Sequence, residues 1–227
     1  KKWQDMILLH QTYSRSFYTQ DNRMSVFTSG AHKFESLLTD IKNATQTINV
    51  MYFIIKNDSV GRGLLDALTA KAKEGVEVRL LIDAIGGRQI MPRHLEKFAA
   101  AGGKYALFFP PRFQCLKYLN MKLNYRNHRK MVIIDGEIGY IGGYNVGNEY
   151  VSKNKKFGNW RDTHLRLTGS CVQDINARFI LDWRFSSKED LVLSAAYYSE
   201  NVQAGTTGVQ IVASGPDSAR SEVKYGY

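Results

Sequence analysis

Cysteine, long apolar runs and acidic side chains are all scarce in this sequence. Only two cysteines occur among the 227 residues, Cys115 and Cys171, which argues against a disulfide framework or a four-ligand zinc site and favours a reducing compartment. No uninterrupted apolar run approaches the length of about 20 residues that crosses a bilayer, and no signal peptide is visible at Lys1. We therefore expect the chain as given to be soluble, with any membrane anchor ahead of it.

The shortage of acidic residues leaves a basic chain. Lys and Arg number 31 against 21 Asp and Glu, a formal charge of +10, and such an excess attracts polyanions, either nucleic acid or an anionic lipid surface. A solvated, slightly basic surface would explain the same charge. Hydrophobic content is 44%, which predicts a packed core, and the length suits one α/β domain with appendages or a domain and part of a second.

The apolar periodicity predicts strands that alternate with helices. Phe34, Leu37, Leu38 and Ile41 fall at helical spacing, whereas Ile48–Ile55 is a near-continuous apolar run typical of a strand covered on both faces. Strands are expected at Met24–Thr28, Ile48–Ile55, Val76–Ile85, Lys104–Phe109, Lys130–Asp135, Ile138–Ile141 and Arg161–Leu167. Helices are expected at Ala31–Ala44, Gly61–Glu74, Pro92–Ala101 and Ser170–Phe185. This order predicts an α/β fold, a three-layer α/β/α sandwich with a central mixed β-sheet.

The same pattern divides the chain into four regions. Residues 1–23 are interpreted as an N-terminal appendage, 24–185 as the main domain and 186–207 as a linker that lacks periodicity. After the linker, Gly208–Gly215 repeats the earlier pattern of a strand ending in Ser-Gly. We therefore interpret 208–227 as the start of a truncated second repeat.

The residues that could carry chemistry gather in one segment, 127–145. On a strand, His128 and Lys130 point to the same face, and the apolar run Met131–Ile134 anchors them in the core. Gly142 and Gly143 end the returning strand and allow a ligand to approach the backbone closely. The segment therefore predicts an imidazole and an ammonium group beside a glycine turn.

A phosphodiester fits that arrangement. The imidazole of His128 would attack phosphorus, while Lys130, Gly143 and Asn145 would bind the phosphate oxygens and stabilise their charge. A nucleophilic imidazole must be held in one tautomer, and the carboxylate of Asp162, on a neighbouring predicted strand, is the candidate for that task.

Asp135 completes the pattern H-x-K-x4-D-x6-G-G-x-N, and we assign it, with His128, Lys130 and Asp162, to the catalytic set, in a structural role around the site. Asp before Gly136 is also what a hairpin turn favours. A lone His-x-Lys is common on protein surfaces, whereas the complete pattern is far more specific.

That pattern resembles the signature of the phospholipase D superfamily. Further segments resemble the first half of bacterial cardiolipin synthases: Val50–Ile55, Gly75–Asp83, Ile141–Glu149, Phe157–His164, Val212–Asp217 and Lys224–Tyr227. The resemblance covers about residues 22–227. Gly143 is typically glycine in that family, whereas the superfamily's nucleases often have serine, so nucleic acid is the less favoured partner.

The resemblance implies a phosphatidyl transfer at a bacterial cytoplasmic membrane, with the catalytic domain in the cytoplasm. A histidine takes the phosphatidyl group from one phosphatidylglycerol, and a second phosphatidylglycerol attacks the phosphohistidine to give cardiolipin. His128 would be the nucleophile or its acid partner, Lys130 and Asn145 would bind phosphate, and Asp162 would orient His128. No metal or other cofactor is implied, and the partners are phosphatidylglycerol and the anionic membrane surface.

The family also needs a second His-x-Lys motif, and this chain has one copy only, at His128. The site is therefore expected to be completed by a second half of the same protein or by a second copy in a homodimer.

Two other functions stay open: a phosphodiesterase or nuclease, because aromatic and basic residues interleave in 112–129, and a membrane-surface module with a degenerate site. The loop 110–126 is expected either to border the lipid entrance or to be an ordinary surface loop.

Overall fold

A computed structural model describes residues 2–108, 127–154, 156, 158–191 and 204–213. In chain order its elements are α1 (Lys2–Tyr13), β1 (Tyr18–Ser29), α2 (Gly30–Asn43), β2 (Thr47–Tyr52), α3 (Ser59–Lys73), β3 (Glu77–Asp83), α4 (Pro92–Ala100), β4 (Lys104–Phe108), β5 (Met131–Ile134), β6 (Ile138–Gly142), the 3-10 helix η3 (Asn148–Val151), β7 (Arg161–Thr168), α5 (Cys171–Ser187) and β8 (Thr207–Gln210). Strands and helices therefore alternate through the first half of the chain, as the apolar periodicity predicts.

Within the described ranges, the strands form one mixed sheet in the order β4-β3-β2-β5-β6-β7-β1-β8. Strands β2, β3 and β4 are parallel, joined by crossovers through α3 and α4. The pairs from β2–β5 to β1–β8 are antiparallel. Because β5 inserts between β2 and β6, strands distant in the sequence become neighbours at the middle of the sheet.

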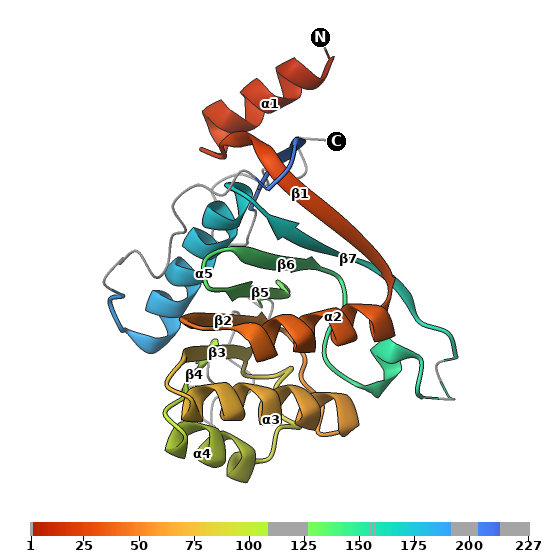
Figure 1. Ribbon diagram of the computed structural model, residues 1–227, viewed down its shortest axis with the longest axis vertical. Coiled ribbons are helices and arrows are strands. Elements are labelled where there is room, and N and C mark those ends of the chain that lie inside the picture. Colours follow the sequence, from red (N-terminus) through yellow and green to blue (C-terminus); the bar gives the residue numbers. More distant parts are fainter. Residues whose placement is uncertain (1, 109–126, 155, 157, 192–203, 214–227) are drawn as a thin grey trace, which may run out of the picture.

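Helices cover both faces of this sheet, as Figure 1 shows. One core lies between the sheet and helices α2, α3 and α4, and it contains Val50 of β2 and Leu37 of α2. The second core lies beneath α5 and contains Met51 and Trp183. Adjacent residues Val50 and Met51 point into different cores because side chains alternate across a strand. The expected three-layer α/β/α sandwich with a mixed sheet is therefore confirmed.

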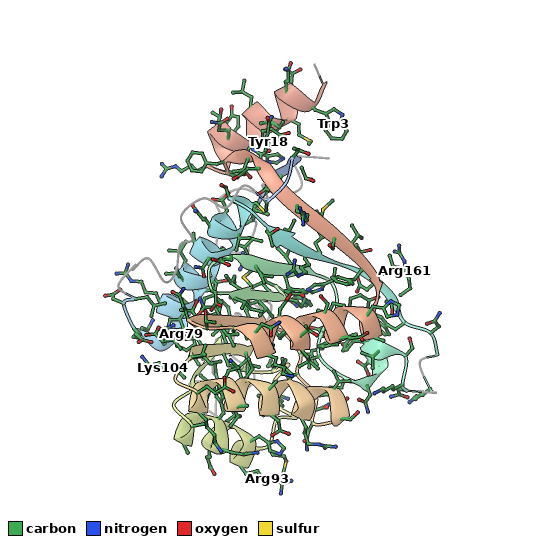
Figure 2. The ribbon with its side chains drawn as sticks, in the orientation of Figure 1. Trp3, Tyr18, Arg79, Arg93, Lys104 and Arg161 are labelled. Atoms are coloured by element: carbon green, nitrogen blue, oxygen red, sulfur yellow. The ribbon has the colours of Figure 1, made fainter. Side chains whose placement is uncertain are left out.

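Several strand ends meet at one edge of the sheet. The last residues of β2 and β6 lie there, beside the first residues of β5 and β7. Arg161, the first residue of β7, lies at this edge, at the opposite side of the molecule from Arg79 and Lys104 (Figure 2). The segment that carries His128 and Lys130 enters β5 at the same edge.

Strand β1 differs most from the sequence expectation. Strand β1 begins at Tyr18, ahead of the expected Met24, because Tyr18–Asn22 pairs with β8, a strand close to the other end of the chain. This polar stretch has no hydrophobic alternation, so its strand character comes from that tertiary pairing. Strand β8 extends the sheet that contains β1, at the junction between the expected linker 186–207 and the expected second repeat.

The division into four regions stays a prediction. The loop 110–126, Cys115, most of the expected linker and the expected helix at 221–227 lie outside the described residues. Helix α1 lies at one end of the molecule and projects from the sheet (Figure 1), and its Trp3 side chain is exposed (Figure 2).

Asp135 forms the turn between β5 and β6, at the edge opposite to His128 and Lys130. Its carboxylate accepts hydrogen bonds from the backbone N–H groups of Thr45 (2.8 Å), Gln46 (2.8 Å) and Thr47 (2.9 Å), and from the Thr45 hydroxyl (3.1 Å). Asp135 therefore fixes the entry of β2 against β5. The expectation that it lies around the site is corrected, because all of β5 separates it from Lys130.

Replacing Asp135 with Ala should lower the free energy of unfolding by about 2–3 kcal/mol, because it removes a charged acceptor of backbone N–H groups. Part of the cost is backbone strain, since Asp135 has φ 53°, a conformation that Asn tolerates better than Ala. Asp135→Asn should therefore lose less than Asp135→Ala. Urea unfolding followed by circular dichroism measures both differences.

The matched control is Glu35→Ala, which removes an exposed carboxylate from α2. It should leave the unfolding midpoint close to that of the unaltered chain. A midpoint for Asp135→Ala equal to that of Glu35→Ala would show that the contacts of Asp135 contribute nothing to the fold.

Candidate active site

The segment before β5 is held from the side of α5. Asp182 of α5 is buried, and its carboxylate accepts hydrogen bonds from the side chains of Asn127 (3.0 Å) and Arg129 (3.1 Å). Arg178 completes an ion pair with the other oxygen of Asp182. Since side chains alternate along an extended segment, fixing Arg129 towards α5 directs His128 and Lys130 to the opposite face.

His128 and Lys130 lie together over one aromatic ring. The exposed imidazole of His128 stacks on Phe53, with ring centroids 4.1 Å apart and 18° between the planes. The Lys130 ammonium lies 5.5 Å from the centroid of the same ring and donates to the carbonyl of His128. Phe53 follows the end of β2, so the pairing of β2 with β5 brings this ring to the motif. The sequence analysis did not single out Phe53.

Asp162 of β7 contributes a carboxylate to the same edge of the sheet. Partial burial lowers the pKa of Lys130, and the negative charge of Asp162 acts in the opposite direction. The backbone N–H of Asp162 donates to the Tyr144 hydroxyl (3.0 Å), which itself donates to the carbonyl of Thr28 (2.7 Å). Asp162 is therefore fixed through its backbone, beside Lys130.

The Asp162 carboxylate fits only because Gly143 has no side chain. A Cβ at Gly143 would lie 2.1 Å from Oδ1 of Asp162, far closer than two such atoms approach. The N–H of Gly143 donates to the carbonyl of Thr163 (2.9 Å). Gly143 thus provides space for a carboxylate, and its backbone N–H is already paired.

Asn145 is buried and holds the chain that follows β2. Its side-chain oxygen accepts from the N–H of Ile54 (3.2 Å), and its Nδ2 donates to the Tyr150 hydroxyl (3.4 Å). The neighbouring Val146 N–H donates to the carbonyl of Ile54 (3.0 Å). Through these bonds, Asn145 fixes the segment that carries Phe53.

The structure therefore brings together most of the residues that the sequence selects. His128, Lys130, Gly143 and Asp162 share one edge of the sheet, and Asn145 supports it. In the described part of the chain, the carboxylate of Asp162 bonds the N–H of Thr163 (2.7 Å) and makes no hydrogen bond to His128. The orienting role of Asp162 and the phosphate-binding roles of Gly143 and Asn145 stay predictions.

Three buried polar residues below this edge were not predicted: Lys33 of α2, Tyr52 of β2 and His164 of β7. The Lys33 ammonium donates to the Tyr52 hydroxyl (2.7 Å). Burial, together with the positive charges of Lys33 and Lys130, lowers the pKa of His164 to about 2. The ring is therefore neutral at physiological pH. The only sequence signal was a polar side chain at a position that strand alternation (Tyr52, His164) or helical periodicity (Lys33) places in the core.

Two features are absent from the described ranges. No group of three or more His, Cys, Asp or Glu side chains is arranged to hold a metal ion. No helix there combines the length and apolar character that crossing a bilayer requires.

Comparison with solved structures supports the fold. The chain superposes on NucT from Helicobacter pylori with a TM-score of 0.55 at 16% identity, covering 73% of this chain and 98% of that one. It superposes on phosphatidylserine synthase from Haemophilus influenzae with a TM-score of 0.59 at 15% identity, covering 87% of this chain and 44% of that one. At such identities the likeness shows a shared fold and carries no activity with it.

Sequence comparison is more specific. A cardiolipin synthase of Oceanobacillus iheyensis is 47% identical over 98% of this chain and 46% of its own length. A cardiolipin synthase of Staphylococcus aureus is 45% identical over 100% of this chain and 45% of its own length. The chain thus spans somewhat less than half the length of these bacterial relatives. The family model described as "Cardiolipin synthase, PLD-like domain" matches residues 37–183, and the chain therefore belongs to the phospholipase D-like family of cardiolipin synthases.

Proposed function

We propose that this chain carries one half of the active site of a phosphatidyltransferase that makes cardiolipin from two phosphatidylglycerol molecules. The observation that carries the proposal is the grouping of His128, Lys130 and Asp162 at one edge of the sheet, in a chain of this family. An exposed imidazole beside an ammonium group and a carboxylate has the parts that a covalent phosphoryl transfer needs.

In the first step, an unprotonated ring nitrogen of His128 attacks the phosphorus of one phosphatidylglycerol. A nitrogen–phosphorus bond forms, the bond from phosphorus to the headgroup glycerol oxygen breaks, and the glycerol leaves with a proton. Lys130 balances the negative charge on the phosphate oxygens. The stacking of His128 on Phe53 limits rotation of the imidazole, so its nitrogens face the position of the phosphate.

In the second step, the free hydroxyl of another phosphatidylglycerol attacks the same phosphorus. The nitrogen–phosphorus bond breaks, His128 returns to its starting form, and the hydroxyl proton passes to a general base. Once substrate has displaced the hydrogen bond between the Thr163 N–H and the Asp162 carboxylate, this carboxylate holds His128 in one tautomer.

The leaving glycerol must take up a proton, and the second hydroxyl must give one up. Both transfers need another acid–base group. The chain contains one His-x-Lys motif, and its relatives are about twice as long. We therefore assign this group to a second motif, in a further half of the same protein or in a second copy of this chain. The enzyme acts at the anionic surface of the bacterial cytoplasmic membrane, and the formal charge of +10 on this chain favours binding there.

Replacing His128 tests the proposed nucleophile. In the protein with its natural flanking sequence, His128→Ala should abolish cardiolipin formation and glycerol release from phosphatidylglycerol vesicles, because the nucleophile is lost. With substrate labelled at phosphorus, an alkaline quench should leave label on the unaltered protein and none on the variant. Thin-layer chromatography and protein-bound radioactivity measure the two quantities.

His32→Ala is the matched control, since it removes an exposed histidine from α2 and should retain full turnover. Cardiolipin formation that survives His128→Ala would exclude His128 as nucleophile. If the unaltered protein cleaved DNA and left phosphatidylglycerol intact, the lipid assignment would be replaced by a nuclease.

Replacing Gly143 tests whether the Asp162 carboxylate needs the space that this glycine leaves. Gly143→Ala should lower kcat by roughly 10²-fold, because a displacement of about 1 Å in a reacting group has an effect of that size. The new Cβ forces the Asp162 carboxylate away, since it would lie 2.1 Å from Oδ1. Initial rates on phosphatidylglycerol, with Tm from thermal unfolding, separate this effect from loss of fold.

Gly63→Ala in α3 is the control, because a Cβ there meets nothing within 4 Å. It should keep kcat and raise stability by about 0.5–1 kcal/mol, as alanine favours a helix over glycine. Unchanged kcat in Gly143→Ala would show that the position of Asp162 is irrelevant to turnover.

A further inference from the structure

A row of residues runs across the sheet directly behind the catalytic lysine. Tyr52 and Lys130 each lie one position beyond the paired residues Met51 and Met131, so they are neighbours on β2 and the segment entering β5. The carbonyl of Lys130 accepts from the N–H of Gly142 (3.4 Å). On the next strand, Gly142 is paired with His164.

Gly142 lies between Lys130 and His164 in this row. A Cβ at Gly142 would lie 2.7 Å from Cγ of His164, so the imidazole occupies the space that a side chain would take. Lys130 flanks Gly142 from one strand and His164 from the other. The positive charge of Lys130 acts on the His164 ring, and so does that of Lys33.

Lys33 approaches this row from helix α2. It is 0% exposed, its Nζ donates to the Tyr52 hydroxyl (2.7 Å), and it lies 3.9 Å from the centroid of Phe34 and 5.0 Å from that of Tyr52. Among the described residues, no carboxylate pairs with Lys33. The two aromatic faces offset only part of the cost of burying a cation.

His164 is equally isolated. It is 0% exposed, and in the described part of the chain neither ring nitrogen has a hydrogen-bond partner. Its neighbours include the rings of Tyr140 and Tyr144, with centroids 6.5 Å and 6.2 Å away. An apolar residue would fill this volume at lower cost, as it would at Lys33. Stability therefore does not explain these polar residues, and their position behind Lys130 suggests a task in the site.

A phosphate anion held by Lys130 would supply the negative charge that Lys33 lacks. Charges interact strongly across a poorly solvated interior, so Lys33 acts on such an anion without touching it. Burial lowers the pKa of Lys33 well below its usual value, and the anion acts in the opposite direction. Occupation of the site therefore favours the charged form of Lys33.

We propose that Lys33, held by Tyr52, is a positioning residue for phosphoryl transfer that acts through Tyr52 and Lys130 and adds a buried positive charge behind the bound phosphate. The inference rests on the proposed function, because it takes the ligand of this site to be a phosphodiester. It assigns a role in the reaction to two residues outside the His-x-Lys pattern, Lys33 and Tyr52.

Lys33→Met tests the proposal in the protein with its natural flanking sequence. Methionine has a similar length and no charge, so Tm should stay the same or rise. The kcat for phosphatidylglycerol should fall about tenfold or more, and inorganic phosphate should bind about tenfold more weakly. Thermal unfolding, initial rates and isothermal titration calorimetry with phosphate measure the three quantities.

Lys42→Met is the matched control, because it removes the same charge from an exposed position of the same helix and should leave all three quantities unchanged. Tyr52→Phe keeps the ring and removes the hydroxyl that holds Lys33, so it should lower kcat by a smaller factor. It also supplies the test if Lys33→Met fails to fold.

The outcomes separate this inference from the proposed function. If the unaltered protein makes cardiolipin and Lys33→Met matches it in kcat and in phosphate affinity, the inference is wrong and the proposed function stands. If the unaltered protein makes no cardiolipin while Lys33→Met weakens phosphate binding, the proposed function is wrong and the role of Lys33 at a phosphate site stands.

Discussion

The buried carboxylate of Asp182 makes the contacts on which the geometry of the candidate site depends. It lies on α5, and it binds the side chains of Asn127 and Arg129 on the segment that enters β5. An extended segment has two faces, so anchoring Arg129, the residue between His128 and Lys130, on one face directs these two side chains to the other. Asp182 provides that anchor. The two functional side chains are directed by a contact that neither of them makes.

The same rule of two faces explains why the layers and the site could be anticipated from the sequence. The apolar runs of β2 and β3 predict strands covered on both sides, and the amphipathic pattern of α2 predicts one buried stripe. These signals are local, and the cores confirm them. His128, Lys130 and Gly143 could be selected as candidate site residues because they lie close together in one short segment.

What the sequence could not supply depends on pairing between distant segments. Phe53 meets His128 only because β2 pairs with β5, across more than 70 residues of chain, and β1 begins at Tyr18 only because β8 pairs with it. Asp135 was placed near the site by its position in the motif. Its hydrogen bonds to residues 45–47 lie at the opposite edge, since a strand carries its two ends apart.

The polar residues below the site show a conflict between stability and function. A sheet whose faces are both covered should bury only apolar side chains, yet Lys33, Tyr52 and His164 occupy such positions. Each lowers the stability that the same volume of hydrocarbon would give. They lie on the side of the sheet that faces α2, behind Lys130, whereas the buried Asn127 and Asp182 on the α5 side are hydrogen-bonded to each other. The buried cation of Lys33 and the unpaired ring of His164 thus lie on the face on which a phosphate would be bound, which is where a preorganised charge can act on a reaction.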